Sequence, residues 1–293
     1  MDFNTQLSEK AQLVNNNLRR LLVEQVDIEG DLKKALEYTL QGQGKRIRAA
    51  LLLWCCGLIS GRANQNAEMA AAAIEMVHTY SLVHDDLPAM DDDDLRRGLP
   101  TCHKAFDEAT AILTGDALLT LAFEILAKEI DEPTVAVRLI GQLAQAAGPA
   151  GMIAGQMADL KAENSKDSEE FLEYIHTNKT AKMFRCAAAM GAICGGAEKS
   201  HFDRLCEYGL KIGLGFQIAD DILDVCGSSK HLGKTTGKDV KAGKATYPAV
   251  VGMEKSKQLA KKLADEAAAL LAPFGPKADT LRQLAMTLLQ RTR

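Results

Sequence analysis

The sequence predicts an all-α fold, and three observations carry that prediction. Only 5% of the 293 residues are aromatic, and only seven are prolines. Long tracts rich in Ala, Leu and Met favour helices because these side chains lose little rotamer freedom there. No stretch shows the sustained alternation of apolar and polar residues that is typical of strands. We expect one large helical bundle forming a single domain over residues 1–293, with a core large enough to enclose a central cavity.

Apolar tracts place the expected helices along almost the whole chain. Their ranges are 4–24, 30–40, 45–59, 65–86, 104–128, 133–158, 168–176, 180–194, 201–226, 247–272 and 277–290. Two segments interrupt the pattern. We expect residues 161–170 to be a solvated connection, whereas residues 227–244 hold Gly and Lys but almost nothing apolar. Such a long loop in a compact domain is typically a lid, a binding segment or a disordered stretch.

Charge and cysteine content exclude several classes of protein. Lys and Arg number 35 against 39 Asp and Glu, so no basic surface is predicted for a nucleic acid. The seven cysteines form no CxxC pair that would suggest zinc, and reduced thiols are the default. The N-terminus lacks the apolar core of a signal peptide. The longest apolar run, Ala49 to Ile59, is too short to cross a bilayer. We expect a cytoplasmic protein with no membrane span.

The most informative segment is HDDLPAMDDDDLRRG, residues 84–98, which places six acids within ten residues. A solvated acidic turn is the simpler interpretation, but the preceding IEMVHTYSLV is apolar and indicates a buried helix up to Asp85. Pro88 disturbs this helix, so that Asp85 and Asp91 can turn toward one point. Arg96 and Arg97 follow, and guanidinium groups suit phosphate. Carboxylates beside arginines indicate magnesium and a phosphorylated ligand.

A second acidic cluster lies in FQIADDILDV, residues 216–225. Its polar side chains share one helical stripe: Gln217, Asp220, Asp221 and Asp224. An amphipathic surface helix explains this stripe equally well when it is considered alone. Two such clusters facing one cavity could instead hold several magnesium ions and clamp a diphosphate.

Cationic residues occur in three further places. Gly44, Lys45, Arg46 and Arg48 open a helix, where free N–H groups favour an anion. Lys179 and Thr180 lie at another expected helix start, and Lys234, Lys238 and Lys244 lie in the Gly-rich loop. Each group alone is typical of solvent-exposed surface charges that bind no ligand. Together with the acidic clusters, they indicate room for two anionic substrates.

These motifs, in this order, resemble those of the trans-isoprenyl diphosphate synthases. The matching segments are GKRIR, DDLPAMDDDDLRRG, GQMADL, KT, FQIADDILD and GKTTGKD, from about residue 40 to residue 248. Within the family, the bacterial farnesyl diphosphate synthases are the nearest resemblance. The resemblance implies the isoprenoid synthase type of helical bundle and a homodimer. It also implies that an allylic diphosphate is joined to isopentenyl diphosphate by ionisation, condensation and elimination.

The resemblance also implies roles for individual residues. Asp85, Asp91 and Asp220 would hold three Mg²⁺ ions, supported by Asp86, Asp221 and Asp224. Arg96, Lys179, Lys234 and Lys244 would complete the allylic diphosphate site, and Thr180 and Gln217 would lie near the allylic carbon. Gly44, Lys45, Arg48, His78 and Arg97 would bind isopentenyl diphosphate. No side chain is an obvious base, and the departing diphosphate is the family's usual proton acceptor.

Some residues in this pattern have simpler interpretations or depart from it. A histidine in an apolar helix is commonly a core residue, but His78 shares a face with Asp85. Gln156 and Asp159 are expected to orient lysines. Ala49 stands where the family usually has Pro, and Leu99 where Lys is common.

Product length depends on bulk just before the first aspartate, where Tyr80 and Ser81 lie. The Tyr80 ring should stop growth at the fifteen-carbon farnesyl diphosphate. Geranyl and geranylgeranyl diphosphate remain alternatives. So do a terpene cyclase, a non-catalytic subunit of a heteromeric synthase and a metal-buffering protein, although none of these last three explains both intact acidic clusters together with the cations.

Overall fold

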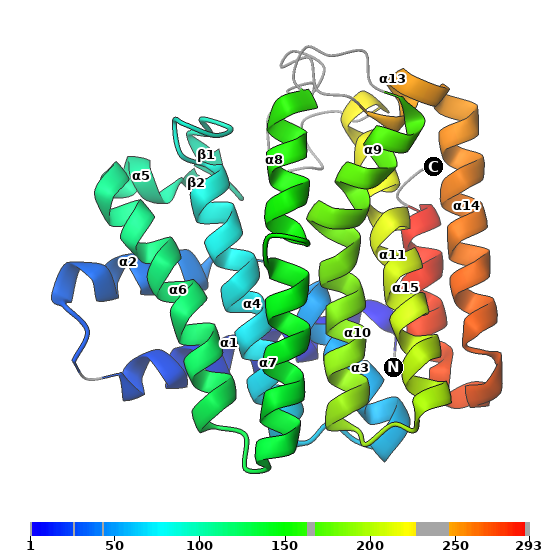
Figure 1. The fold of residues 1–293 in the computed structure, drawn as a ribbon, viewed down its shortest axis with the longest axis horizontal. Coiled ribbons are helices and arrows are strands. Elements are labelled where there is room, and N and C mark those ends of the chain that lie inside the picture. Colours follow the sequence, from blue (N-terminus) through cyan, green and yellow to red (C-terminus); the bar gives the residue numbers. More distant parts are fainter. Residues whose placement is uncertain (1, 26, 43, 163–167, 227–245, 291–293) are drawn as a thin grey trace.

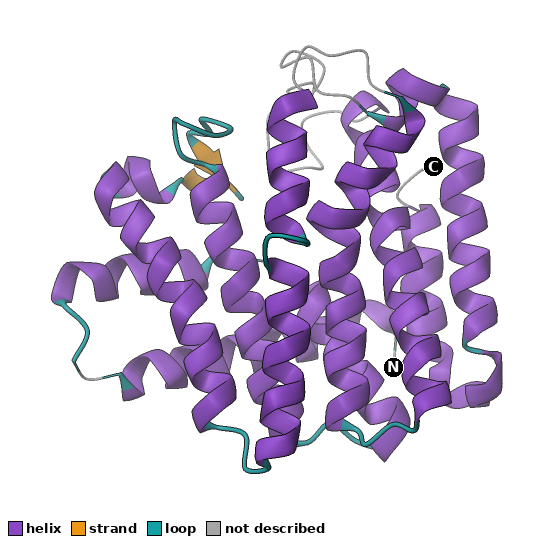
Figure 2. Cartoon of the chain, viewed as in Figure 1, coloured by secondary structure: helices purple, strands orange, loops and turns teal. Residues whose placement is uncertain are grey.

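The computed structural model describes residues 2–25, 27–42, 44–162, 168–226 and 246–290, and it confirms the all-α prediction (Figures 1 and 2). The first half of the chain contains α1 (Phe3–Glu24), α2 (Gly30–Gln41), α3 (Ile47–Ser60), α4 (Gln65–Asp85), β1 (Leu95–Arg96), β2 (Leu99–Pro100), α5 (Cys102–Ala105), α6 (Glu108–Lys128) and α7 (Pro133–Ala147). The second half contains α8 (Met152–Ala162), α9 (Glu169–His176), the π-helical turn η1 (Thr177–Ala181), α10 (Lys182–Cys194), α11 (Lys199–Cys226), α13 (Tyr247–Val251), α14 (Met253–Leu270), the 3₁₀ helix η2 (Ala272–Ala278) and α15 (Asp279–Gln290).

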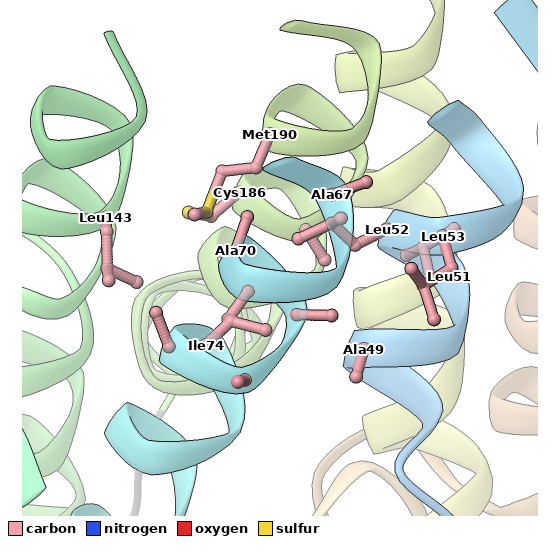
Figure 3. Close-up of a cluster of buried hydrophobic side chains, with 14 of the residues drawn as sticks. Ala49, Leu51, Leu52, Leu53, Ala67, Ala70, Ile74, Leu143, Cys186 and Met190 are labelled. Carbon is pink, nitrogen blue, oxygen red and sulfur yellow. The ribbon is translucent and has the colours of Figure 1, made fainter. Parts of the chain in front are cut away.

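The main hydrophobic core lies where α3, α4 and α10 meet (Figure 3). Small residues allow these helices to approach closely: the alanines from Ala70 to Ala73 are fully buried on α4. On α10, a Cβ at Gly191 would lie 2.2 Å from the carbonyl oxygen of Leu52 on α3. The core therefore fixes the helices that carry the basic motif and the first acidic cluster relative to one another.

Three predicted helices are interrupted in the structure. The range 104–128 breaks at Phe106 and Asp107, because the Asp107 side chain accepts the N–H of Thr110 and caps α6 as a new helix. The range 133–158 was expected to be continuous, but α7 ends before Gly148, and Pro149 lies in the turn to α8, where its ring and missing N–H oppose a continuous helix. The range 247–272 breaks at Gly252, whose φ of +85° is outside the helical region.

A two-residue hairpin replaces the expected irregular chain after the first acidic cluster. Leu95 and Arg96 pair antiparallel with Leu99 and Pro100. The intervening Arg97 and Gly98 both have positive φ, 56° and 82°, which is the requirement of a type I′ turn. The local turn chemistry, and not an apolar alternation, makes this small strand pair.

One helix in the described part of the chain, α6, is long and apolar enough by length and composition to cross a membrane. The sequence expectation considered only the run from Ala49 to Ile59 and overlooked it. Core helices pass the same test, and α6 packs against α4 with Leu118 and Ala122 fully buried. A single helix of this kind is weak evidence for a membrane span.

Candidate active site

The first acidic cluster lies where α4 ends at Asp85. The chain then folds back, because the N–H of Asp91 donates to the carbonyl oxygen of Asp85 at 2.8 Å. Burial raises the pKa of the Asp85 carboxyl to about 6, with Lys179 opposing the shift and Asp91 reinforcing it. The two aspartates are therefore neighbours that repel each other, and Lys179 acts on the same site.

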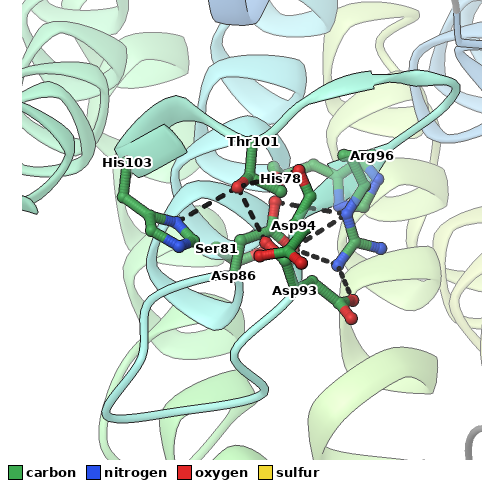
Figure 4. Close-up of polar contacts among 8 residues, drawn as sticks. All are labelled: His78, Ser81, Asp86, Asp93, Asp94, Arg96, Thr101 and His103. Atoms are coloured by element: carbon green, nitrogen blue, oxygen red, sulfur yellow. Dashed lines mark hydrogen bonds and ion pairs between the residues drawn. The ribbon is translucent and has the colours of Figure 1, made fainter. Parts of the chain in front are cut away.

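The side chain of Asp86, the next residue, is paired with Arg96 of the same chain segment (Figure 4). Its Oδ1 accepts a hydrogen bond from Arg96 Nε at 2.9 Å, and Arg96 also pairs with Asp93 Oδ2 at 3.2 Å. Both carboxylates are buried, with Asp86 3% exposed. In this arrangement Asp86 and Asp93 hold Arg96 on the hairpin against the end of α4. The sequence did not single out Asp93 because its partner depends on how the hairpin folds.

A second hydrogen-bonded group in the same segment involves Thr101, which follows β2. Its hydroxyl donates to the Asp93 carbonyl oxygen at 2.7 Å and lies 3.1 Å from His103 Nδ1. Both Thr101 and His103 are buried. These contacts join the two strands at the open end of the hairpin, opposite the turn at Arg97 and Gly98.

The second acidic cluster is tied to η1 by a chain of hydrogen bonds. Thr180 Oγ1 donates to Gln217 Oε1 at 3.0 Å, and Gln217 Nε2 donates to Asp221 Oδ1 at 3.2 Å. The other oxygen of Asp221 accepts the N–H of Tyr247 at 3.0 Å. His176 Nε2 lies 3.7 Å from that oxygen, and burial lowers the pKa of this histidine to about 3, so it is neutral. His176 was missed by the sequence analysis, which had no signal that it faces Asp221.

Lys179 is presented by η1, a turn wider than the α-helices around it. Its Nζ contacts Asp159 Oδ2 at 2.6 Å, the orienting role expected for Asp159. Burial lowers the pKa of Lys179, but Asp85, Asp159 and Asp91 together outweigh burial and raise it. Gly155 makes the approach possible, because a Cβ there would lie 2.1 Å from the Lys179 nitrogen. π-helical turns are frequent at functional sites.

The residues expected to bind isopentenyl diphosphate converge around the start of α3. Arg48 donates a hydrogen bond to His78 Nε2 at 3.3 Å, which requires His78 to be neutral. Burial lowers the pKa of His78 well below its usual value, and the charges of Arg48 and Arg97 lower it further. The Arg48 guanidinium also lies 4.8 Å from the centre of the Phe184 ring. Arg97 lies so close to Gly44 that a Cβ there would be 2.5 Å from its guanidinium.

Two electrostatic interactions indicate that the acidic and basic groups lie in one region. Burial lowers the pKa of Arg48, whereas the charges of Glu75 and Asp220 oppose that shift, so Asp220 on α11 acts on a cation of α3. Lys179 similarly acts on Asp85 of α4. Figure 1 shows α4 and α11 ending at the same end of the bundle. Each acidic helix end therefore lies near a cation that another helical segment supplies, Lys179 for Asp85 and Arg48 for Asp220.

The other predicted site residues differ in burial, and some lie outside the described part of the chain. Lys45 is exposed, whereas Arg46, grouped with it on sequence, is buried. Tyr80 is 7% exposed and belongs to the main core, and Ser81 donates to the His78 carbonyl oxygen at 2.9 Å. Lys234, Lys238 and Lys244 lie outside the described residues.

The carboxylates of this site suit magnesium, which also binds substrate phosphates and water, better than a metal ion whose ligands all come from the protein. Within the described ranges, no three His, Cys, Asp or Glu side chains are grouped as a complete metal site. Mg²⁺ is usually bound by one or two carboxylates together with substrate phosphates and water. Asp85 and Asp91 supply such a pair, and their mutual repulsion would be relieved by a divalent cation.

Comparisons with known proteins agree with this geometry. The family model described as polyprenyl synthetase matches residues 29–271. A farnesyl diphosphate synthase of Geobacillus stearothermophilus is 48% identical over 255 residues, covering 86% of this chain and 85% of its own length. The large subunit 1 of a chloroplastic heterodimeric geranylgeranyl pyrophosphate synthase of Arabidopsis thaliana is 46% identical over 282 residues, covering 93% and 75%.

A solved structure is also similar over nearly its whole length. The geranyltransferase of Helicobacter pylori, complexed with magnesium and isoprenyl diphosphate, has a TM-score of 0.84 and 33% identity, covering 99% of this chain and 97% of that one. The chain belongs to the polyprenyl synthetase family, the trans-isoprenyl diphosphate synthases, and is a prenyltransferase of isoprenoid biosynthesis.

Proposed function

We propose that this prenyltransferase is a farnesyl diphosphate synthase that condenses dimethylallyl or geranyl diphosphate with isopentenyl diphosphate. One observation carries the proposal: at one end of the bundle, Asp85 and Asp91 of the first acidic cluster act on Lys179, and Asp220 of the second acts on Arg48. Such an arrangement can hold one diphosphate through metal and a second directly through Lys and Arg. The single domain over residues 1–293 forms part of this proposal.

The allylic diphosphate would lie between the two acidic ends. Asp85, Asp91 and Asp220 would hold three Mg²⁺ ions, which act as Lewis acids on the diphosphate oxygens. Lys179 contributes a fixed positive charge, because Asp159 holds its ammonium at 2.6 Å. The oxygens of Thr180 and Gln217, which are linked by a hydrogen bond, would lie near the allylic carbon, where positive charge develops. Arg96, held by Asp86 and Asp93, completes the anion site, and Lys234 and Lys244 are proposed to join it.

Isopentenyl diphosphate would bind beside the start of α3. Lys45, Arg48 and Arg97 supply the positive charges, and the missing side chain of Gly44 leaves room for the Arg97 guanidinium. Neutral His78 accepts a hydrogen bond from Arg48 and so fixes its direction. After condensation, the departing diphosphate would accept the proton that is eliminated.

The defining experiment is incubation with Mg²⁺, isopentenyl diphosphate and geranyl diphosphate, followed by chromatography of the dephosphorylated alcohols. Farnesol is the expected product, with none when EDTA replaces Mg²⁺. A mixture dominated by geranylgeraniol would instead support the second candidate, a geranylgeranyl diphosphate synthase like the Arabidopsis relatives. Absence of any condensation product would refute the proposed activity and favour a non-catalytic subunit.

Chain length is proposed to stop at Tyr80. This ring lies five residues before Asp85, about 7.5 Å along the helix at 1.5 Å per residue, and it is buried in the main core. Tyr80→Ala removes that ring and is expected to lengthen the product, whereas Ser81→Ala removes only a hydroxyl bonded to the His78 carbonyl. Unchanged product length in Tyr80→Ala would contradict the assignment of Tyr80 as the floor of the pocket.

A homodimer and a cytoplasmic location complete the proposal. Helix α7 contacts both α6 and α8. Five large apolar side chains are exposed on these three helices: Ile112, Leu113, Val137, Ile153 and Met157. We propose that this side of the bundle, which carries exposed apolar side chains on three helices, forms the dimer interface. All seven cysteines are free and six are buried, as expected in a reducing compartment. Light scattering of the purified protein tests the dimer, and a monomeric mass would contradict it.

A further inference from the structure

Two buried side chains lie beneath the basic motif and form an ion pair. Arg46 precedes α3, and Glu75 lies on α4, with their side chains 1% and 2% exposed. Arg46 NH1 lies 3.3 Å from Glu75 Oε2. Because both are buried so completely, neither side chain is available to contact a diphosphate.

Arg46 uses its remaining donors to tie three segments together. Its Nε donates to Asn15 Oδ1 of α1 at 2.9 Å, and its NH2 donates to the carbonyl oxygens of Leu40 and Gly42 at 2.5 and 3.3 Å. Its backbone has a φ of +48°, which is unfavourable for a residue with a Cβ. The side-chain contacts therefore stabilise an unfavourable backbone conformation between Lys45 and α3.

Glu75 acts on the first turn of α3. Its Oε1 accepts the N–H of Ala49 at 3.3 Å, at a helix start that has no side-chain cap of its own. A negative charge is favourable there because of the helix dipole. The proline that the family usually has at position 49 could not donate this hydrogen bond. Three residues farther along α4, His78 contacts Arg48. Glu75 and His78, about one turn apart on α4, thus both hold the first turn of α3.

We propose that Arg46 and Glu75 are positioning residues for the isopentenyl diphosphate site. By fixing the start of α3, the buried pair determines where exposed Lys45 and partly buried Arg48 present their charges. This inference rests on the proposed function, because it assigns that substrate to the site. It predicts a selective effect on one substrate, which a purely stabilising ion pair would not produce.

The test uses the double variant Arg46→Met with Glu75→Gln. It removes both charges together, which avoids the unpaired buried carboxylate that Arg46→Met alone would leave. Glutamine retains an oxygen that can accept the Ala49 N–H. Thermal melting establishes that the variant is folded. We expect the Kd and KM for isopentenyl diphosphate to rise about 10-fold or more, because small displacements of a binding group have large effects. The KM for geranyl diphosphate should change less than about threefold.

Two further variants sharpen the result. Lys211→Met with Glu266→Gln removes a 2.6 Å ion pair between α11 and α14 and is expected to leave the affinity for both substrates unchanged. Arg46→Lys keeps the charge beside Glu75 but cannot make the forked contacts with Asn15 and the two carbonyls. Its affinity for isopentenyl diphosphate should fall between those of the wild type and the double variant.

Calorimetric binding of isopentenyl diphosphate separates this inference from the proposed function. A wild type that binds the ligand but makes no product refutes the proposed function, and the comparison of Kd values still tests the positioning role. Unchanged binding in the folded double variant, or equal loss for both substrates, overturns the inference. A wild type that does not bind isopentenyl diphosphate overturns it as well.

Discussion

Replacing Asp85 by asparagine is expected to stabilise the metal-free protein while removing most of its turnover. Burial raises the pKa of this carboxyl from 3.8 to about 6, so the native state disfavours the charged form. Since each pKa unit corresponds to about 1.4 kcal/mol, the charge costs about 3 kcal/mol at pH 8. Asparagine has nearly the same shape and no charge. The same substitution removes a proposed magnesium ligand, and turnover should fall by about 100-fold or more.

The sign of the effect makes it pH-dependent. A raised carboxyl pKa means that the native protein binds the proton more tightly than the unfolded chain does. The destabilisation is therefore fully present above pH 6 and disappears as the pH falls toward 3.8, leaving about 1 kcal/mol at pH 4.5. Urea unfolding in EDTA, followed by circular dichroism at pH 8 and pH 4.5, measures the difference between variant and wild type.

The neighbouring aspartate provides a matched control of opposite sign. Asp86 is buried and hydrogen-bonded to Arg96, so Asp86→Asn removes one of the two carboxylates that hold this guanidinium, leaving Asp93, and should destabilise the protein at pH 8. The reasoning on Asp85 fails if Asp85→Asn is less stable than the wild type at pH 8, or if its advantage is the same at both pH values.

Three further predictions concern the contacts around this site. Gly155→Ala would place a Cβ 2.1 Å from the Lys179 backbone nitrogen; both the melting temperature and kcat should fall, and an unchanged kcat would show that η1 need not be held against α8. Gly44→Ala would place a Cβ 2.5 Å from the flexible Arg97 guanidinium and displace it. The KM for isopentenyl diphosphate should therefore rise severalfold, with little change in melting temperature. An unchanged KM would show that Arg97 does not bind that substrate. Since the pKa of His176 is lowered to about 3, its contribution to stability is complete above pH 6.5 and is lost as the pH falls toward 3, by about 1.4 kcal/mol per unit. His176→Gln should flatten this loss between pH 6.5 and 5, and parallel urea titrations of variant and wild type would contradict the assignment.

Much of the fold was predictable because helices depend on local pattern. Apolar spacing located the helices that carry the acidic clusters, and the end of α4 at Asp85 lies within one residue of the expected position. The breaks after α7 and after α13 were harder to predict. Pro149 and Gly252 occur inside runs that are otherwise favourable to helix, so the local signals of proline and glycine were outweighed in the prediction although they mark both breaks.

The sequence alone determined which charged groups exist and that two acidic clusters end apolar helices. It did not determine which charge pairs with which. Asp85 and Asp86 are adjacent and chemically identical, yet one lies beside Asp91 with a raised pKa and the other holds Arg96. Glu75 and His176 have partners 29 and 45 residues away, Arg46 and Asp221. Such pairings depend on burial and on contacts between distant segments, so only the tertiary structure decides whether a carboxylate faces the substrate or anchors the protein.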